Sequence, residues 1–158
     1  MTTLDELFAA HYVALVRLAA QLVDDPESAE DVVQDVFAGL DPSRVEDPLH
    51  YLRRAVVNRS RSVLRRRRTV RAFAGRAERM ELVEAADSGT VRTDERVRVL
   101  AAIDTLPRRQ REAVVLRYYE DLAVGEIARI LEATPSAISS ALTRALDTLA
   151  VTLEGDDD

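Results

Sequence analysis

The stretch PLHYLRRAVVNRSRSVLRRRR, residues 48–68, decides how the first half of the chain folds. Its apolar side chains return at helical spacing, at Leu49, Leu52, Val56 and Val63. This pattern predicts one helix with a single apolar face, and Pro48 suits the first turn of that helix. Most other positions are arginine or another polar residue, so the helix must bury one stripe and expose a cationic one.

Charge is strongly segregated along the chain. The 158 residues carry a net charge of −6, yet residues 51–79 hold 11 arginines and one acid, a net charge of +10. Residues 1–50 hold 11 acids and two arginines, a net charge of −9. Arginine is the only cation in the sequence, and its planar guanidinium suits phosphate. A cationic segment on a folded helix favours salt-dependent polyanion binding, and a merely solvated face is the alternative.

The rest of the chain also has helical periodicity and no strand pattern. Apolar side chains at steps of three and four predict helices over residues 3–23 and 27–40, and others beyond residue 96. We therefore expect an all-α fold of two small helical modules joined by a flexible acidic linker. The expected ranges are 1–79 for the first module, 80–95 for the linker, 96–153 for the second module and 154–158 for an acidic tail.

The composition excludes several classes of protein. The chain has no cysteine, so it has neither disulfides nor thiolate metal sites, and it suits a reducing cytoplasm. No apolar run approaches the ~18 residues of a membrane span. With two histidines and no Gly-rich phosphate loop, no catalytic constellation is apparent. We expect a cytoplasmic protein that is not an enzyme and has no catalytic residue, cofactor, metal or membrane partner.

The segment VGEIARILEATPSAISSALTRAL, residues 124–146, predicts two helices separated by a tight turn. This arrangement is typical of a helix-turn-helix, whose second helix enters the DNA major groove. An ordinary helical hairpin is the alternative. Thr134 is a suitable cap for the second helix, whereas Ala123 cannot cap the first one, and the turn has Glu132 where glycine is usual.

Three stretches together resemble a known family. LPRRQREAVVLRYYEDLAVGEIARIL, residues 106–131, resembles region four of bacterial RNA polymerase sigma factors of the extracytoplasmic-function (ECF) group. DPESAEDVVQDVF, residues 25–37, resembles the region-two helix, and YLRRAVVNRSRSVLRRRR, residues 51–68, resembles the strand-separating helix that follows it. The resemblance covers nearly the whole chain apart from the linker and tail. It implies a promoter-specificity subunit that binds core RNA polymerase and melts promoter DNA.

The resemblance also implies protein partners. Region two of the family docks on the clamp coiled coil of the largest polymerase subunit, and region four docks on the flap of the second-largest subunit. The region-two contacts would fall on Glu30, Asp31, Gln34 and Asp35, a carboxylate row that suits a basic surface. Without the resemblance, solubility alone would explain this row, and a metal site is a third alternative. An anti-sigma factor is a further partner that the family implies.

DNA contacts in the first module follow from the same resemblance. The loop at residues 41–47, with Asp47, corresponds to the family's base-capturing loop. Tyr51 lies where the family has an aromatic residue that stacks on a base, and Asn58 matches a frequent asparagine. The backbone phosphates would be held by Arg53, Arg54, Arg59, Arg61, Arg65, Arg66, Arg67 and Arg68.

DNA contacts in the second module are expected to be weak or unusual. Its candidate residues are Arg117, Ser136, Ser139, Ser140, Thr143 and Arg144. The family carries basic side chains where this chain has Ser139 and Ala141, and base readout needs long polar side chains. Phosphate contacts are expected instead from Arg108, Arg109, Arg111 and Arg117. The rival hypothesis is a stand-alone helix-turn-helix regulator that acts without polymerase, although such a regulator would need a recognition helix richer in readout residues.

Overall fold

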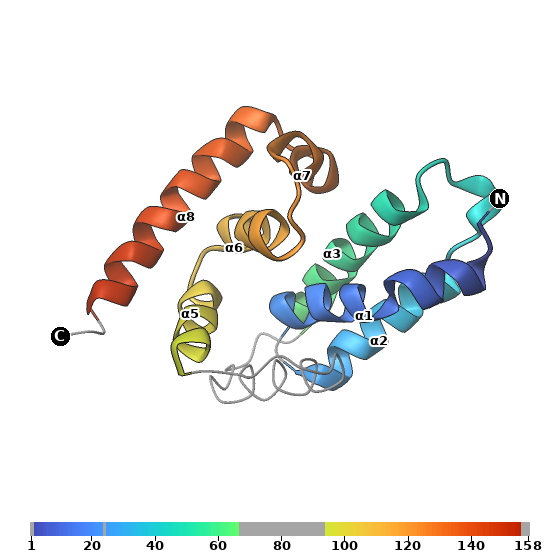
Figure 1. The fold of residues 1–158 in the computed structure, drawn as a ribbon, viewed down its shortest axis with the longest axis horizontal. Helices are drawn as coiled ribbons and strands as arrows, with labels where there is room; N and C mark the ends of the chain where they lie inside the picture. Colours follow the sequence, from blue (N-terminus) through green and yellow to red (C-terminus); the bar gives the residue numbers. More distant parts are fainter. Residues whose placement is uncertain (1, 24, 67–93, 156–158) are drawn as a thin grey trace. The chain divides into compact units, whose positions relative to one another are not determined.

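The computed structural model describes residues 2–23, 25–66 and 94–155, and every regular element in these ranges is helical (Figure 1). The predicted all-α fold is confirmed. The chain divides into two compact units, with the boundary between residues 90 and 91. Most of the predicted linker lies outside the described residues, but its last two positions, Asp94 and Glu95, already belong to a helix.

The N-terminal unit is a three-helix bundle in which each helix contacts the other two (Figure 1). Its elements are α1 (Leu4–Leu22), α2 (Pro26–Ala38), the short 3₁₀ turn η1 (Pro42–Arg44) and α3 (Pro48–Arg66). The core consists of aliphatic side chains, among them Leu15, Leu18, Val33, Leu52 and Val56. The unit has few aromatic residues, so the burial of these aliphatic side chains is the main source of its folding stability.

Side-chain caps define where the first two helices begin. Thr3 and Glu6 form a reciprocal capping box at α1, each backbone N–H donating to the other residue's side chain at 3.2 Å. At α2, Asp25 accepts from the Ser28 backbone N–H at 2.7 Å. Such caps satisfy N–H groups that have no partner inside the helix. They therefore fix the residue at which each helix starts.

The first turns of α1 are more exposed than the apolar spacing predicts. Leu4 and Phe8 keep 39% and 43% of their surface, although both belong to the apolar series. The Phe8 ring stacks on Tyr12 with centroids 4.4 Å apart and meets Phe37 edge-on at 5.1 Å. Leu4 and Phe8 therefore lie at the edge of the core, whereas Leu7 and Phe37 beside them are buried.

The C-terminal unit packs its long last helix against three others (Figure 1). Its elements are α5 (Asp94–Asp104), α6 (Arg108–Val114), the π-helical turn η2 (Val115–Tyr119), α7 (Val124–Leu131) and α8 (Pro135–Gly155). Leu100, Leu116, Ile127, Ile130 and Ile138 form the most buried part of the core. The predicted cap of α8 is confirmed, because Thr134 Oγ1 accepts from the Ala137 N–H at 3.1 Å.

The turn between α7 and α8 carries local backbone strain. Glu132 ends α7 in the left-handed conformation, with φ 55° and ψ 47°, where the sequence lacks the usual glycine. A residue with a Cβ atom in this conformation costs about 1–2 kcal/mol. The chain tolerates this cost because α7 and α8 bury apolar side chains on both sides of the turn.

Replacing Glu132 with glycine should stabilise the protein. We expect Glu132→Gly to raise the free energy of unfolding by about 1 kcal/mol relative to Glu132→Ala, since only glycine removes the left-handed penalty. Glu132→Ala is the matched control because it removes the same carboxylate and keeps the Cβ atom. Urea denaturation followed by circular dichroism measures the difference. Equal stability of the two variants would contradict the role assigned to this conformation.

Candidate nucleic-acid interface

The outward face of α2 is acidic. The helix buries Ala29, Val32, Val33 and Val36, which fixes its rotation about its own axis. The predicted polymerase-contact residues all lie exposed on the surface: Glu30, Asp31, Gln34 and Asp35. Three carboxylates on one exposed helix face suit a cationic partner surface.

Two residues of this row contact neighbouring helices. Gln34 Nε2 donates to the Tyr12 hydroxyl of α1 at 3.5 Å, a long hydrogen bond. Asp35 Oδ2 accepts from Arg59 Nη2 of α3 at 3.0 Å. The tertiary structure thus joins a predicted polymerase-contact residue to a predicted DNA-contact residue, a pairing that no sequence pattern indicated.

The outward face of α3 carries polar and aromatic groups. Tyr51 is 38% exposed, and Asn58 is exposed two turns later on the same side of the helix. Asn58 Oδ1 accepts from Arg61 Nη1 at 3.4 Å, a weak contact that leaves its amide donors on the surface. This face therefore offers a ring for stacking and an amide with donors and an acceptor.

An open hollow of about 790 Å³ lies between α2 and α3. Asp35 and Val36 line it from α2 and Gly39 from the end of that helix, and the residues from α3 are Tyr51, Arg54, Ala55, Asn58, Arg59 and Ser62. Four of the residues predicted to contact DNA thus share one cavity wall. Its size and its mix of aromatic, amide and guanidinium groups suit a nucleobase with its attached phosphates.

The remaining predicted arginines of α3 differ in exposure. Arg53, Arg54, Arg59 and Arg61 are half-buried, with their stems against the bundle. Arg65 and Arg66 are exposed at the end of the helix, where Arg65 Nη2 donates to Ser62 Oγ at 3.4 Å. Arg67 and Arg68 lie outside the described residues. The described arginines thus extend the cationic surface beyond the hollow.

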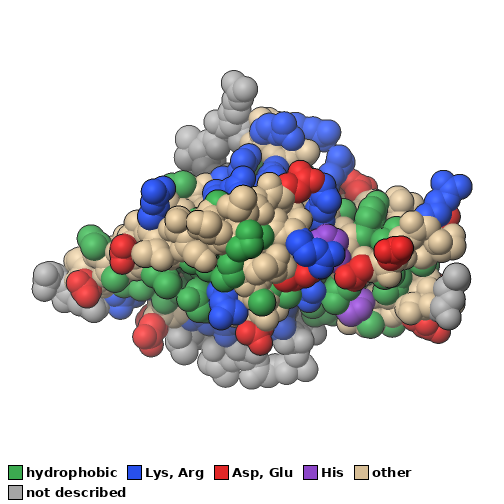
Figure 2. Space-filling view, turned by 90° about the horizontal axis from the view of Figure 1, so that it is seen from above, with side chains coloured by type: hydrophobic (Ala, Val, Ile, Leu, Met, Phe, Trp, Pro, Cys, Tyr) green, Lys and Arg blue, Asp and Glu red, His purple; other side chains and the backbone are tan. Residues whose placement is uncertain are grey.

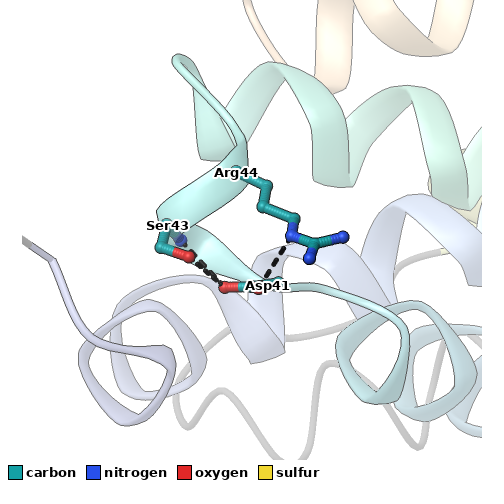
Figure 3. Close-up of polar contacts among 3 residues, drawn as sticks. All are labelled: Asp41, Ser43 and Arg44. Atoms are coloured by element: carbon teal, nitrogen blue, oxygen red, sulfur yellow. Dashed lines mark hydrogen bonds and ion pairs between the residues drawn. The ribbon is translucent and has the colours of Figure 1, made fainter.

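The loop before α3 is ordered by two aspartates. Asp41 Oδ1 accepts from the Ser43 N–H at 3.1 Å and the Ser43 hydroxyl at 2.6 Å (Figure 3). The other Asp41 oxygen lies 3.5 Å from Arg44 Nε (Figure 3). Asp47, predicted to bind DNA, accepts from the His50 N–H at 3.2 Å and so caps the first turn of α3.

Sequence reasoning missed Arg44 as a candidate. Its side chain is 86% exposed at the loop tip, and the contact to Asp41 uses Nε and leaves the two terminal nitrogens facing outward. Two parallel guanidinium donors suit a base edge or a phosphate. The Asp-x-Ser spacing at residues 41–43 could have indicated a local turn, but exposure of the neighbouring arginine depends on the fold.

The predicted contact residues of α8 all lie on its surface. Ser136, Ser139, Ser140, Thr143 and Arg144 are exposed, although the Thr143 hydroxyl donates to the Ser139 carbonyl at 3.0 Å. Ala141, in contrast, is 7% exposed and faces the core. A basic side chain at this position could not reach DNA, so positions 139 and 141 are not equivalent, contrary to the expectation from sequence. The exposed face offers hydroxyl groups and a single cation.

Two arginines of the C-terminal unit have structural contacts. Arg117 Nη1 donates to the Leu122 carbonyl at 2.9 Å and so holds the segment that leads into α7. Arg111 is 6% exposed, and its Nη1 lies 3.9 Å from Asp104 Oδ1. The expectation that Arg111 contacts phosphate is therefore wrong, because a guanidinium buried beside a carboxylate cannot reach DNA.

The described part of the chain holds neither a cluster of metal ligands nor a membrane-spanning helix. Within it, no three His, Asp or Glu side chains are grouped to hold a metal ion. None of the helices between residues 2 and 155 that the structure describes is long and apolar enough to cross a membrane. In the face shown by Figure 2, cationic and acidic side chains are interspersed.

Known families match both units. Residues 7–70 match the model for sigma-70 region 2, and residues 96–149 match the model for sigma-70 region 4. The chain is 30% identical to an RNA polymerase sigma-E factor of Streptomyces avermitilis, over 91% of this chain and 81% of that protein. It is 31% identical to the ECF RNA polymerase sigma factor SigK of Mycolicibacterium vanbaalenii, over 85% of this chain and 76% of that protein.

Two solved structures share the fold. CnrH in complex with the cytosolic domain of CnrY matches with a TM-score of 0.68 and 26% identity, over 97% of this chain and 88% of that chain. The sigma factor RpoE of Bartonella quintana, in complex with the anti-sigma factor NepR, matches with a TM-score of 0.66 and 20% identity. The latter match covers 95% of this chain and 96% of that chain.

Proposed function

This chain belongs to the ECF group of bacterial RNA polymerase sigma factors, and we propose that it opens promoter DNA in the groove between α2 and α3. As a sigma factor it binds core RNA polymerase, gives it promoter specificity and directs initiation. The observation that carries the proposal is the single hollow lined by Tyr51, Arg54, Asn58 and Arg59. Sigma factors are non-enzymatic initiation factors, so binding free energy must drive the opening.

Captured bases would supply part of this free energy. An extruded base of the non-template strand would stack on the exposed Tyr51 ring, and the Asn58 amide would meet its edge. Arg44 and the loop at residues 41–47 would hold a second base. Unpairing costs a few kcal/mol, which stacking and hydrogen bonding of this kind can offset.

Phosphate contacts would supply the rest of the free energy that opens the DNA. Arg54 and Arg59 line the larger hollow, Arg59 and Arg66 line a smaller one beside it, and Arg65 is exposed near the end of α3. Each phosphate neutralised releases counterions, so affinity should fall steeply with salt. Arg67 and Arg68 lie outside the described residues, and we include them among the phosphate contacts on the family resemblance alone.

The protein partners follow from the family. We assign the row Glu30, Asp31, Gln34 and Asp35 to the clamp coiled coil of the largest polymerase subunit, and the C-terminal unit to the flap of the second-largest subunit. The matched RpoE structure contains an anti-sigma factor, so we include an anti-sigma factor among the partners of this chain. Acting with polymerase, the chain would work in the cytoplasm.

The recognition helix α8 would contribute little to DNA affinity. Its exposed face presents Ser136, Ser139, Ser140, Thr143 and one cation, Arg144. Hydroxyl groups can donate to phosphates or a close base edge, but they add no charge. The C-terminal unit would therefore serve more for docking on polymerase than for reading sequence.

Transcription from a promoter library tests the proposed function. Purified core polymerase, with and without this protein, would transcribe the library, and the start sites would be sequenced. We expect new starts that depend on the protein and share an upstream motif. If no such starts arose and the chain bound duplex DNA without polymerase, a stand-alone regulator would replace the polymerase-dependent function.

Tyr51 should be needed for opening the promoters so identified. We expect Tyr51→Ala to lower the open-complex equilibrium about 5- to 150-fold, which corresponds to one lost base stack. Tyr51→Phe keeps the ring and should stay near wild type. Permanganate reactivity of unpaired thymines measures the open fraction. Wild-type opening by Tyr51→Ala would exclude stacking at this position.

Adding charge to α8 should strengthen promoter binding. We expect Ser139→Arg to tighten holoenzyme binding and to steepen the salt dependence by about one phosphate contact. The matched control is Ala150→Arg, which adds the same charge at an exposed position farther along α8. Binding titrations over a range of salt concentrations measure both effects. Equal behaviour of the two variants would mean that the amino-terminal half of α8 does not face DNA.

A further inference from the structure

The ion pair between Asp35 and Arg59 joins two surfaces with different proposed partners. Asp35 belongs to the acidic row on α2 that would face polymerase, and Arg59 belongs to the side of α3 that would face DNA. The pair connects Arg59 Nη2 and Asp35 Oδ2 at 3.0 Å, across 24 residues of sequence. One carboxylate thus holds a DNA-facing guanidinium while the chain is unbound.

The pair also divides the groove between α2 and α3. On one side lies the hollow of about 790 Å³ that contains Tyr51 and Asn58. On the other lies a smaller hollow of about 220 Å³, lined by Asp31 and Arg66 among others. Asp35 and Arg59 are the residues that line both hollows. A strand that runs from the base-binding hollow toward the end of α3 must pass the ion pair.

Opening the ion pair requires little free energy. The Arg59 side chain is 39% exposed and the Asp35 side chain 58%, and ion pairs at such exposure contribute little to stability. The Arg59 Nε is buried and, among the described residues, has no hydrogen-bond acceptor. Once the pair opens and the guanidinium turns outward, a phosphate with several oxygens can accept from Nε and Nη2 together, whereas Asp35 accepts from Nη2.

We propose that the Asp35–Arg59 ion pair is a gate that withholds Arg59 from DNA until polymerase engages Asp35. The inference rests on the proposed function and adds a regulatory step to it. A basic polymerase surface would compete with Arg59 for the Asp35 carboxylate. Once released, Arg59 binds a phosphate, and the two hollows become one continuous groove. Polymerase docking and strand binding then favour each other, because both require the open pair.

Strand binding by the full chain without polymerase tests the gate. The probe is a fluorescein-labelled single strand of mixed sequence, measured by anisotropy at low ionic strength. We expect Asp35→Asn to lower Kd about two- to fivefold, which is the range for an exposed ion pair. Asp31→Asn is the matched control, because it removes the same charge from the same exposed helix face and leaves the Asp35–Arg59 pair intact. The gate predicts a smaller effect for it.

The Arg59→Gln background separates the gate from general electrostatics. There, Asp35→Asn should tighten binding no more than Asp31→Asn does. Equal effects of the two substitutions in the wild-type background would overturn the gate, and so would an Asp35→Asn effect that persists without Arg59. If the gate fails while Arg59→Gln still weakens strand binding, the proposed function stands. If Arg59→Gln and Tyr51→Ala both leave strand binding unchanged, the proposed DNA groove fails instead.

The holoenzyme tests the coupling to polymerase. At saturating core polymerase, the advantage of Asp35→Asn over wild type should disappear on promoters from the transcription test, since docking has already opened the pair. Asp35→Asn should also weaken binding to core polymerase, measured separately with labelled protein. An advantage that persisted in the holoenzyme would show that docking leaves the pair closed and would overturn the coupling.

Discussion

The packing of α1, α2 and α3 around one aliphatic core is the constraint on which the proposed DNA groove depends. Leu15, Val33 and Leu52 are almost completely buried, so each helix has a fixed rotation about its own axis. A shift of α3 by one residue would turn it by about 100° and bring arginine into the core. The same burial therefore places the acidic side of α2 and the arginine side of α3 along one groove.

Opposite charges that are separated in sequence thus become neighbours in space. Acids predominate in residues 1–50 and arginines in residues 51–79, yet Asp35 and Arg59 are in direct contact. Such a contact between exposed groups is weak, so external partners can compete for both members. A protein that acts through binding rather than covalent chemistry gains from this arrangement, because one partner can influence the affinity for another.

In the C-terminal unit, local contacts at the turns fix the position of α8. A left-handed Glu132, the Thr134 cap and the Arg117 contact to the Leu122 carbonyl together fix the approach to α8. Arg98 Nη2 donates to the Leu153 carbonyl at 3.2 Å and ties the far end of α8 to α5. The result is a well-defined helix whose exposed face carries little charge. This combination fits a docking unit better than a reader of base sequence.

The sequence by itself determined the helices, the Thr134 cap of α8 and the family, because apolar periodicity, capping patterns and family motifs are local properties of the chain. The apolar spacing of residues 27–40 also placed the acidic row opposite the buried face, and the exposure of this row agrees with it. Only the tertiary structure decided that Asp35 pairs with Arg59, that Arg111 is buried beside Asp104 and that Arg44 projects from a loop held by Asp41. The pairings and burial of these arginines depend on how separate segments pack, and a long flexible side chain carries no local signal of its partner.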